Sequence, residues 1–343
     1  MRRAIQFALC VLFLAALACV CYRRPVSDDF DRYIYEAIVR GKSQPIEAVY
    51  AIVKHENPRA EASSILDSPQ HLRELEPLYA IRPIYLATIA LLSRILPPQS
   101  AINLVSSVSL FGIGFVVLLW TKRPLLTCLL LAASPVVLLG RFGTPDALSA
   151  LLLIAALWLL DHRLLDRRRD LFALAFLFVS LGVRTDNILL LFAVLAWSAW
   201  EKRLSYPVVA LTAALGLGIV LAIDHWADAY GWVVLFRFSF VGGRYPAQIP
   251  HTLAVREYLS AFARGSLAVA DRVAIWLLLA IVAWKRCPNF LLILVAAAAT
   301  VHFLLYPSPE DRYLIWAYIV TGVLFIRSFE NVIEKAGSTL SEI

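Results

Sequence analysis

The chain has 343 residues, of which 60% are hydrophobic and only 17% are charged. A soluble domain carries about 25% charged and about 45–50% apolar residues, so this composition excludes an ordinary water-soluble protein. The net charge of +7 does not indicate a nucleic-acid-binding protein, because the basic residues stand in short clusters between apolar segments. We therefore expect a polytopic membrane protein in contact with membrane lipids and without a nucleic-acid partner.

The apolar residues gather into runs of about 15–20 residues, the length that crosses a hydrocarbon core about 30 Å thick. We expect an all-α polytopic membrane protein, a single domain over 1–343 with about ten to twelve transmembrane helices. Short spans such as 171–183 and 187–200 are typical of helices that end inside a cavity. The predicted spans are 4–21, 79–96, 101–120, 125–140, 147–160, 171–183, 187–200, 206–223, 267–284, 290–306 and 313–326.

Clusters of Lys and Arg mark the loops that stay in the cytoplasm. They occur at Arg2–Arg3, Lys122–Arg123, Arg163 with Arg167–Arg169, Lys202–Arg203 and Lys285–Arg286. Both termini and the loops at 161–170, 201–203 and 285–289 are therefore predicted to be cytoplasmic. The segments at 22–78, 141–146, 184–186, 224–265 and 307–312 then face the opposite side. Three full spans between 79 and 140 contradict this arrangement, so one of them is expected to be re-entrant, superficial or wrongly divided.

Two long segments lie on the predicted non-cytoplasmic side. The first, 22–78, has an acidic pair followed by apolar residues at helical spacing, including Phe30, Ile34 and Ile38. This pattern predicts an amphipathic helix along the membrane surface. The second, 224–265, contains a Gly-Gly-Arg-Tyr-Pro turn at 242–246 that is expected to close over a cavity.

Ionisable residues at the ends of apolar spans are energetically costly, so they indicate a function. On the predicted non-cytoplasmic side they form one set with Tyr245: Asp28, Asp29, Arg82, Arg141, Asp146, Arg184, Asp186, Arg244, Glu310 and Arg312. Because these residues face the same side of the membrane, we expect them to line a shared pocket.

The order of these motifs resembles the GT-C superfamily of membrane glycosyltransferases, especially the dolichyl-phosphate-mannose mannosyltransferase and aminoarabinose transferase group. The resemblance covers nearly the whole chain. It rests on the acidic pair, the helix after it, Arg82-Pro83, Pro145-Asp146-Ala147-Leu148 and Glu310-Asp311-Arg312-Tyr313-Leu314. The first loop reads Ser-Asp-Asp-Phe rather than Asp-x-Asp, and no sizeable soluble domain follows the last predicted span.

The resemblance implies a GT-C-like bundle in an inner (plasma) membrane, with the active site on the non-cytoplasmic face. It also implies inverting transfer of one sugar from a polyprenyl-phosphate carrier to a glycan, lipid or protein acceptor. Asp28 or Asp29 would take the proton from the acceptor hydroxyl. Arg82, Arg184, Arg244 and Arg312 would bind the phosphate, for which a guanidinium is well shaped. Tyr245 would stack on the sugar. Asp28 and Asp29 would also suit a divalent cation, Mg²⁺ or Mn²⁺.

Structural interpretations of the same residues stay open. Asp28 and Asp29 could cap a helix, and Asp146 could be a stabilising carboxylate in a first helical turn. Arg184 and Asp186 could form a structural ion pair, and His302 is expected to be a hydrogen-bonded core residue. A transporter or flippase of a lipid-linked or anionic solute is the alternative function, because charged residues and broken helices occur there too. A third possibility is a non-catalytic membrane subunit.

Overall fold

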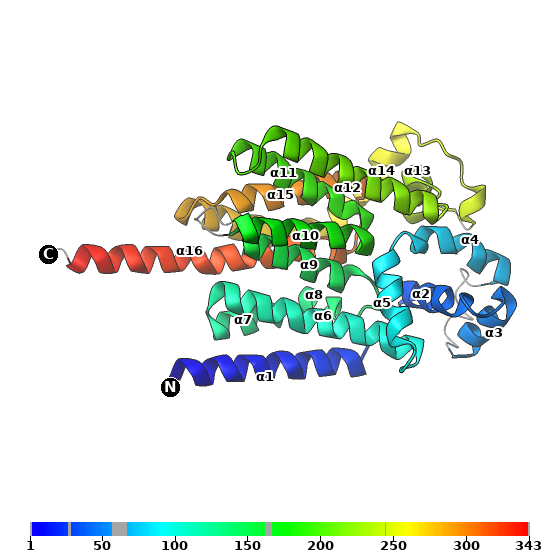
Figure 1. The fold of residues 1–343 in the computed structure, drawn as a ribbon, viewed down its shortest axis with the longest axis horizontal. Coiled ribbons are helices and arrows are strands. Elements are labelled where there is room, and N and C mark those ends of the chain that lie inside the picture. Colours follow the sequence, from blue (N-terminus) through cyan, green and yellow to red (C-terminus); the bar gives the residue numbers. More distant parts are fainter. Residues whose placement is uncertain (1, 27–28, 57–66, 162–166, 244, 342–343) are drawn as a thin grey trace.

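The computed structural model describes residues 2–26, 29–56, 67–161, 167–243 and 245–341, and within these ranges it contains helices and no strand. The predicted all-α polytopic fold is confirmed. The main bundle consists of helices that run along the long axis of the molecule (Figure 1): α1 (Arg2–Arg23), α6 (Pro98–Thr121), α9 (Asp146–Leu160), α10 (Arg167–Val183), α11 (Ile188–Trp200), α12 (Tyr206–Trp226), α14 (Val255–Arg286), α15 (Phe290–Leu305) and α16 (Ile315–Ser341).

By length and composition, four of the described helices can cross a membrane, or up to five if one bent pair counts as a single span. The four lie at Ala4–Arg23, Pro98–Thr121, Tyr206–Trp226 and Val255–Arg286. Several further apolar helices have 10–17 residues, too few to cross a full bilayer upright. The total of ten to twelve crossings therefore stays a prediction.

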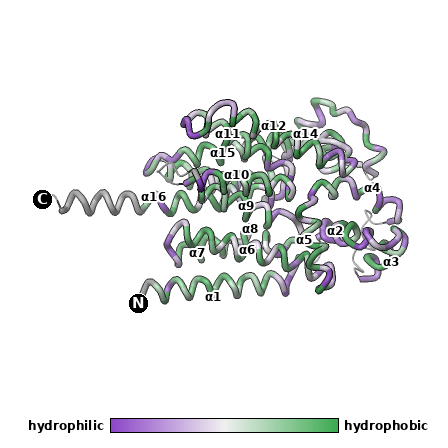
Figure 2. The backbone as a smooth tube through the Cα atoms, viewed as in Figure 1, coloured by the Kyte–Doolittle hydropathy of each residue, from purple (hydrophilic) through white to green (hydrophobic). Residues whose placement is uncertain are grey.

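The helices of the bundle are largely apolar along their length, as the hydropathy colouring shows (Figure 2). Leu211 on α12 and Leu267 on α14 are 62% and 80% exposed, an arrangement suited to lipid rather than to water. Inside the bundle, α9 lies between α6, α10 and α16, and its Leu153 and Ala156 are buried. On α6, a side chain at Gly114 would come within 2.5 Å of Leu14, so the glycine lets α1 approach closely.

The front half of the bundle is broken where the sequence predicted continuous spans. The predicted span 79–96 is instead the end of α4 (Pro69–Ala80) and α5 (Pro83–Leu92), which meet at an angle of 112°. The predicted span 125–140 is divided into α7 (Pro124–Leu131) and α8 (Ser134–Leu139). Proline has no N–H to donate and disfavours helical geometry before it, so Pro83 and Pro135 account for both breaks. The departure from three full spans that was expected between 79 and 140 therefore corresponds to these two breaks.

The predicted helix after the acidic pair is present as α2 (Phe30–Gly41). It packs against α3 (Ile46–Glu56), α4 and α6, so much of its surface meets protein. Helices α2, α3 and α4 form one end of the molecule, and both chain ends lie at the other (Figure 1). The second long segment folds as α13 (Trp232–Phe236), a π-helical turn at Arg237–Val241 and a 3-10 turn at Pro246–Gln248. Its last residues already belong to α14.

Candidate active site

Charged side chains from five separate parts of the chain meet at the α2–α4 end of the bundle. They come from the start of α2, the bend between α4 and α5, the segment joining α8 to α9, and two 3-10 turns at Thr185–Asn187 and Asp311–Tyr313. Each is a place where a helix begins or ends, so the side chains project from the ends of apolar spans. The structure thus brings several of the predicted span ends together at one end of the bundle.

Arg184 is the most fully paired cation of the cluster. Its Nε and Nη2 donate to the two carboxylate oxygens of Asp186 at 3.0 and 2.6 Å, and its Nη1 pairs with Asp146. The guanidinium also lies 4.7 Å from the ring centre of Tyr313. Asp146, the first residue of α9, accepts a further hydrogen bond of 2.7 Å from Thr144. The structural ion pair that the sequence left open is therefore present, and it extends to Asp146.

Arg312 forms the second centre of the cluster. It lies 2.8 Å from Asp31 and 2.5 Å from Glu310, and its Nε is 3.7 Å from the same Asp146 that pairs with Arg184. The two arginines thus share one buried carboxylate. Buried charges are tolerated when each has a partner, and removing one partner is strongly destabilising. The ion pairs between arginines and carboxylates explain how so many ionised groups occupy one end of an apolar bundle.

Asp29 differs from the other carboxylates because it is buried without an arginine in contact. It is 4% exposed, and one carboxylate oxygen accepts the backbone N–H of Gly143. The other oxygen has no hydrogen-bond partner among the described residues. Although Asp29 occupies the N-cap position of α2, its side chain makes no capping hydrogen bond, so the capping interpretation fails for this residue.

The surroundings of Asp29 make its carboxylate basic. Burial, together with the negative charge of Asp31, raises the pKa of Asp29 to about 7, against the opposing effects of Arg312 and the Gly143 hydrogen bond. A carboxylate with a pKa near 7 and one unoccupied oxygen has the properties of a general base.

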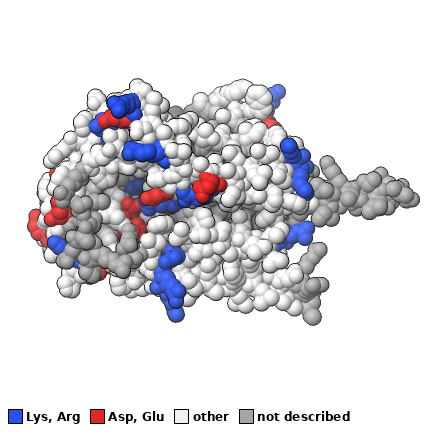
Figure 3. Space-filling model, turned by 180° about the vertical axis from the view of Figure 1, so that it is seen from behind, with Lys and Arg blue, Asp and Glu red and all other residues white. Residues whose placement is uncertain are grey.

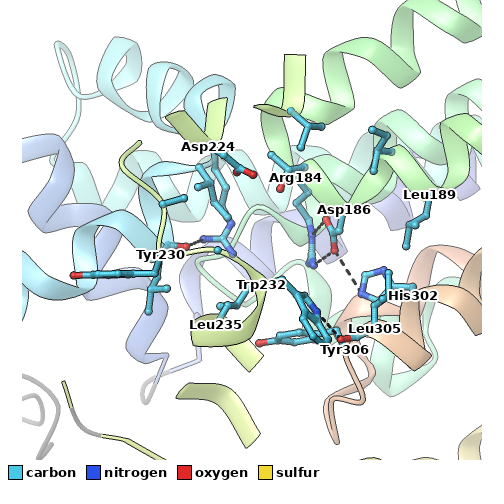
Figure 4. A pocket seen from close by; sticks show the side chains of 18 of the residues that line it. Arg184, Asp186, Leu189, Asp224, Tyr230, Trp232, Leu235, His302, Leu305 and Tyr306 are labelled. Atoms are coloured by element: carbon cyan, nitrogen blue, oxygen red, sulfur yellow. Dashed lines mark hydrogen bonds and ion pairs between the residues drawn. The ribbon is translucent and has the colours of Figure 1, made fainter. Parts of the chain in front are cut away.

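A cavity of about 430 Å³ opens beside the charged cluster. Arg184, Asp186 and His302 lie together on one wall, with His302 Nε2 3.5 Å from Asp186, and Trp232 and Tyr306 lie on another (Figure 4). The remaining lining is largely apolar and comes from α11, α12, α13 and α15: Ile188, Leu189, Val220, Leu235 and Leu305. The cavity therefore has a charged end and an apolar end.

Arg82 also lines this cavity, and among the described residues it forms no direct ion pair with an acid. In the part of the chain that the structure describes, its one hydrogen bond runs to the carbonyl oxygen of Leu78 at 3.0 Å. Its guanidinium lies 5.7 and 5.4 Å from the ring centres of Tyr35 and Tyr79. A guanidinium held by aromatic rings with unused N–H donors is suited to bind an anion.

The structure separates the predicted site residues into three groups. Asp29, Asp146, Arg184, Asp186, Glu310 and Arg312 belong to the cluster, and Arg82 lines the cavity. Two others lie elsewhere: Arg141 donates to the carbonyl oxygen of Arg24 at the end of α1, and Tyr245 contacts Asp67 at 3.1 Å. The hydrogen bonds of Arg141 and Tyr245 thus do not bring them into contact with the cluster, and neither residue lines the cavity. Asp28 and Arg244 lie outside the described residues.

Sequence reasoning missed several members of the site. Asp31 accepts from Tyr79 at 2.7 Å and pairs with Arg312, although it was seen only as part of a helix start. His302, expected to be an ordinary core residue, lines the cavity. The described residues contain no group of three or more His, Cys, Asp or Glu side chains that could hold a metal ion. A divalent cation near Asp28 stays a prediction.

Comparisons with known proteins agree with this architecture. Residues 91–226 match the family described as dolichyl-phosphate-mannose-protein mannosyltransferase. The fold is similar to that of ArnT from Cupriavidus metallidurans, solved bound to undecaprenyl phosphate, with a TM-score of 0.54 and 13% identity. The match covers 93% of this chain and 60% of that one, so the chain spans less than two thirds of the ArnT structure. No curated protein shows a matching sequence. The resemblance to the GT-C glycosyltransferases is confirmed, because residues 91–226 match one of their families and 93% of the chain is similar in fold to ArnT.

Proposed function

We propose that this protein is a membrane glycosyltransferase that moves one sugar from a polyprenyl-phosphate carrier to a glycan, lipid or protein acceptor. The observation that carries the proposal is that a carboxylate and a guanidinium, each without a direct ion pair among the described residues, lie at the same end of the bundle. Asp29 is a buried carboxylate with an unoccupied oxygen, and Arg82 is a guanidinium without an acidic partner. The undecaprenyl phosphate bound to ArnT and the dolichyl-phosphate-mannose of the family name support a lipid-phosphate donor.

The 430 Å³ cavity suits the donor because its two ends differ in polarity. The phosphate would bind Arg82 at the charged end, and the first isoprenoid units would lie among Leu189, Val220 and Leu235. Helix α12 contributes to this wall and exposes large apolar side chains on its outer face, so the carrier would enter sideways from the lipid. Positive charge at the phosphate stabilises the charge that develops there as the sugar departs.

Asp29 would act as the general base. Its unoccupied oxygen would take the proton of the acceptor hydroxyl while that oxygen attacks the anomeric carbon. The bond from this carbon to the phosphate oxygen breaks in the same displacement, which releases polyprenyl phosphate and inverts the anomeric centre. Asp29 is not among the residues that line the cavity. The acceptor would therefore approach from the α2 side and the donor from the α11–α12 side.

The proposal includes the topology predicted from the basic loops. The protein would lie in the inner (plasma) membrane with both termini in the cytoplasm and the active site on the opposite face. The shared location of the two chain ends, far from α2–α4, supports this arrangement (Figure 1). If a Mg²⁺ or Mn²⁺ ion assists at Asp28 and Asp29, removal of divalent cations with a chelator will lower turnover, and added Mg²⁺ or Mn²⁺ will restore it.

The test is a transfer assay with the purified protein in lipid, a panel of radiolabelled polyprenyl-phosphate sugars and a crude acceptor extract. Asp29→Asn keeps the size of the side chain but removes the base, so turnover should fall by about 10²–10⁴-fold. Asp271→Asn is the matched control, because Asp271 lies on α14 and its side chain is 81% exposed. Equal turnover by Asp29→Asn and wild type contradicts the assignment of the base. Movement of labelled carrier across the bilayer without sugar transfer favours the transporter or flippase instead.

A further inference from the structure

A second cavity, of about 270 Å³, lies at the end of the bundle opposite to the charged cluster. The end of α9, the turn between α11 and α12, the turn between α14 and α15, and α16 all contribute to it. Its polar lining consists of Asp161, Arg203, Cys287, Asn289, Arg327 and Ser328, none of which lines the first cavity. Its volume is about nine times that of one water molecule in the liquid, so it can hold a larger group.

The acidic residue of this cavity is already satisfied. Asp161 accepts the indole N–H of Trp120 at 2.6 Å and the amide of Asn289 at 3.3 Å, and it forms an ion pair with Arg327. Its negative charge is therefore matched by the positive charge of Arg327. The other cation of the lining, Arg203, has an acidic partner, Asp170, that does not itself line the cavity.

Arg203 is held in a fixed orientation with most of its donors unused. Its guanidinium lies 4.3 Å from the ring centre of Trp197, which in turn stacks on Phe290 at 5.8 Å. Among the described residues, its one polar contact is with Asp170, at 3.4 Å. A guanidinium has five N–H donors in a planar fork that matches phosphate oxygens. The stacking fixes the fork before a ligand arrives.

Exposed aromatic side chains show the depth of this cavity in the membrane. Trp200 and Tyr206, three residues before and after Arg203, are 80% and 76% exposed. Trp and Tyr are enriched at the membrane–water interface, at the level of the lipid headgroups. Basic side chains also stand on this end of the molecule (Figure 3). Lipid phosphates are therefore present at the depth where Arg203 lies.

We propose that this cavity binds the phosphate-bearing headgroup of an anionic phospholipid from the adjacent leaflet, with Arg203 as its main ligand. Basic pockets between transmembrane helices bind such headgroups in other membrane proteins. A small soluble phosphate compound has the same chemistry, so the experiment must separate the two sources. The site shares no residue with the donor cavity, and the proposal does not depend on the proposed activity.

The first experiment measures retained lipid by native mass spectrometry after the purified protein is exchanged into phosphatidylglycerol or phosphatidylcholine. Wild type should retain phosphatidylglycerol about tenfold more strongly, because both headgroups carry a phosphate but only that of phosphatidylglycerol keeps a net negative charge, whereas the choline cation of phosphatidylcholine is repelled by Arg203. Arg203→Gln should lose this preference. Lys202→Gln is the matched control, since Lys202 is the exposed neighbour in the same turn and does not line the cavity. Equal retention by Arg203→Gln and Lys202→Gln overturns the proposal.

A second measurement uses the wild-type chain and so does not depend on the folding of a variant. Cys287 lines the cavity, so occupancy should slow its alkylation by N-ethylmaleimide, followed by peptide mass spectrometry. Phosphatidylglycerol should slow the reaction several-fold relative to phosphatidylcholine, whereas inorganic phosphate should leave it unchanged. Protection by inorganic phosphate to the same extent overturns the lipid as the ligand. Equal rates in both lipids overturn the site.

Discussion

The two ends of the bundle both carry arginines, but they use them in different ways. At the α2–α4 end, Arg184 and Arg312 are largely buried and share Asp146 between them. At the opposite end, basic side chains such as Lys202 are exposed to solvent or to lipid headgroups. Figure 3 shows acidic and basic side chains intermingled over the first region and chiefly basic ones at the opposite end.

The difference teaches how to separate charges that fix topology from charges that belong to a site. A topological charge needs no partner, since water solvates it and the rule depends on its position in a loop. A buried charge needs a partner with exact placement, because burial without one costs several kcal/mol, on the order of 3–5. Two residues at each end depart from its general pattern. At the first end, Asp29 and Arg82 form no direct ion pair among the described residues. At the second end, Asp161 and Arg203 lie in a cavity and form ion pairs.

The largest effect on stability should come from Arg184→Met. This change leaves the buried Asp146 and the partly exposed Asp186 without their nearest counter-charge, so we expect a loss of about 3–5 kcal/mol. Thermal unfolding in detergent, monitored by tryptophan fluorescence, measures it. Lys285→Met at the opposite end is the control and should change stability by less than about 0.5 kcal/mol. Similar melting temperatures for the two variants would remove the distinction between the ends.

Asp29→Asn should stabilise the protein, and the gain should depend on pH. Burial raises the pKa of Asp29 from its ordinary value of 3.8 to about 7. The folded state therefore holds this proton more tightly, and wild-type stability falls as pH rises from about 4 to about 7. The variant lacks this loss, so its advantage should be near zero at pH 4 and reach up to about 4 kcal/mol above pH 7. Melting temperatures at pH 4, 6 and 8 test this, and an advantage that is independent of pH argues against an ionisable buried Asp29.

The same pKa predicts the pH dependence of turnover. A general base must be ionised, so the rate should rise tenfold per unit of pH below about 7 and level off above it. The assay is initial-rate sugar transfer between pH 5 and 9, with donor and acceptor well below saturation, because this condition reports the pKa of the free protein. A flat profile over this range would show that Asp29 does not limit the reaction.

Asp161→Asn should lower the stability of the protein by an intermediate amount, and it tests a charged group at the end opposite to the α2–α4 cluster. Asp161 is the carboxylate that accepts from Trp120 and Asn289 and pairs with Arg327. An asparagine keeps one acceptor but leaves Arg327 without its counter-charge, so we expect a loss of about 1.5–3 kcal/mol. Thermal unfolding again gives the value. A loss as small as that of Lys285→Met would mean that the ion pair of Asp161 and Arg327 contributes little to stability.

Much of the fold was predictable because lipid imposes simple rules on sequence. Long apolar runs and clusters of basic residues predicted the all-α bundle and the grouping of loops. The breaks at Pro83 and Pro135 were not predicted, since α4–α5 and α7–α8 are apolar enough to read as continuous spans. Proline is visible in a sequence, but the 112° turn depends on how α5 packs against α2 and α6.

The site was predictable in its sidedness and only partly in its membership. Asp146, Arg184 and Arg312 stand at span ends, where a charge is conspicuous, and the structure brings them into contact. Asp31 was overlooked because it lies within a helical pattern. Its partner Tyr79 is 48 residues away in the sequence, so their contact could not be predicted either. Arg141 was included for its position at a span end. Its hydrogen bond to Arg24 is a tertiary contact that sequence cannot reveal.

The central claim is that one group takes the proton and another holds the phosphate, and a split between binding and turnover tests it most directly. Undecaprenyl phosphate binding and sugar transfer should be measured side by side for Asp29→Asn and Arg82→Gln, in the same lipid. The account predicts that Asp29→Asn binds the carrier as wild type does and loses turnover, whereas Arg82→Gln weakens binding by about tenfold or more. Loss of binding in Asp29→Asn together with unchanged binding in Arg82→Gln would contradict the account.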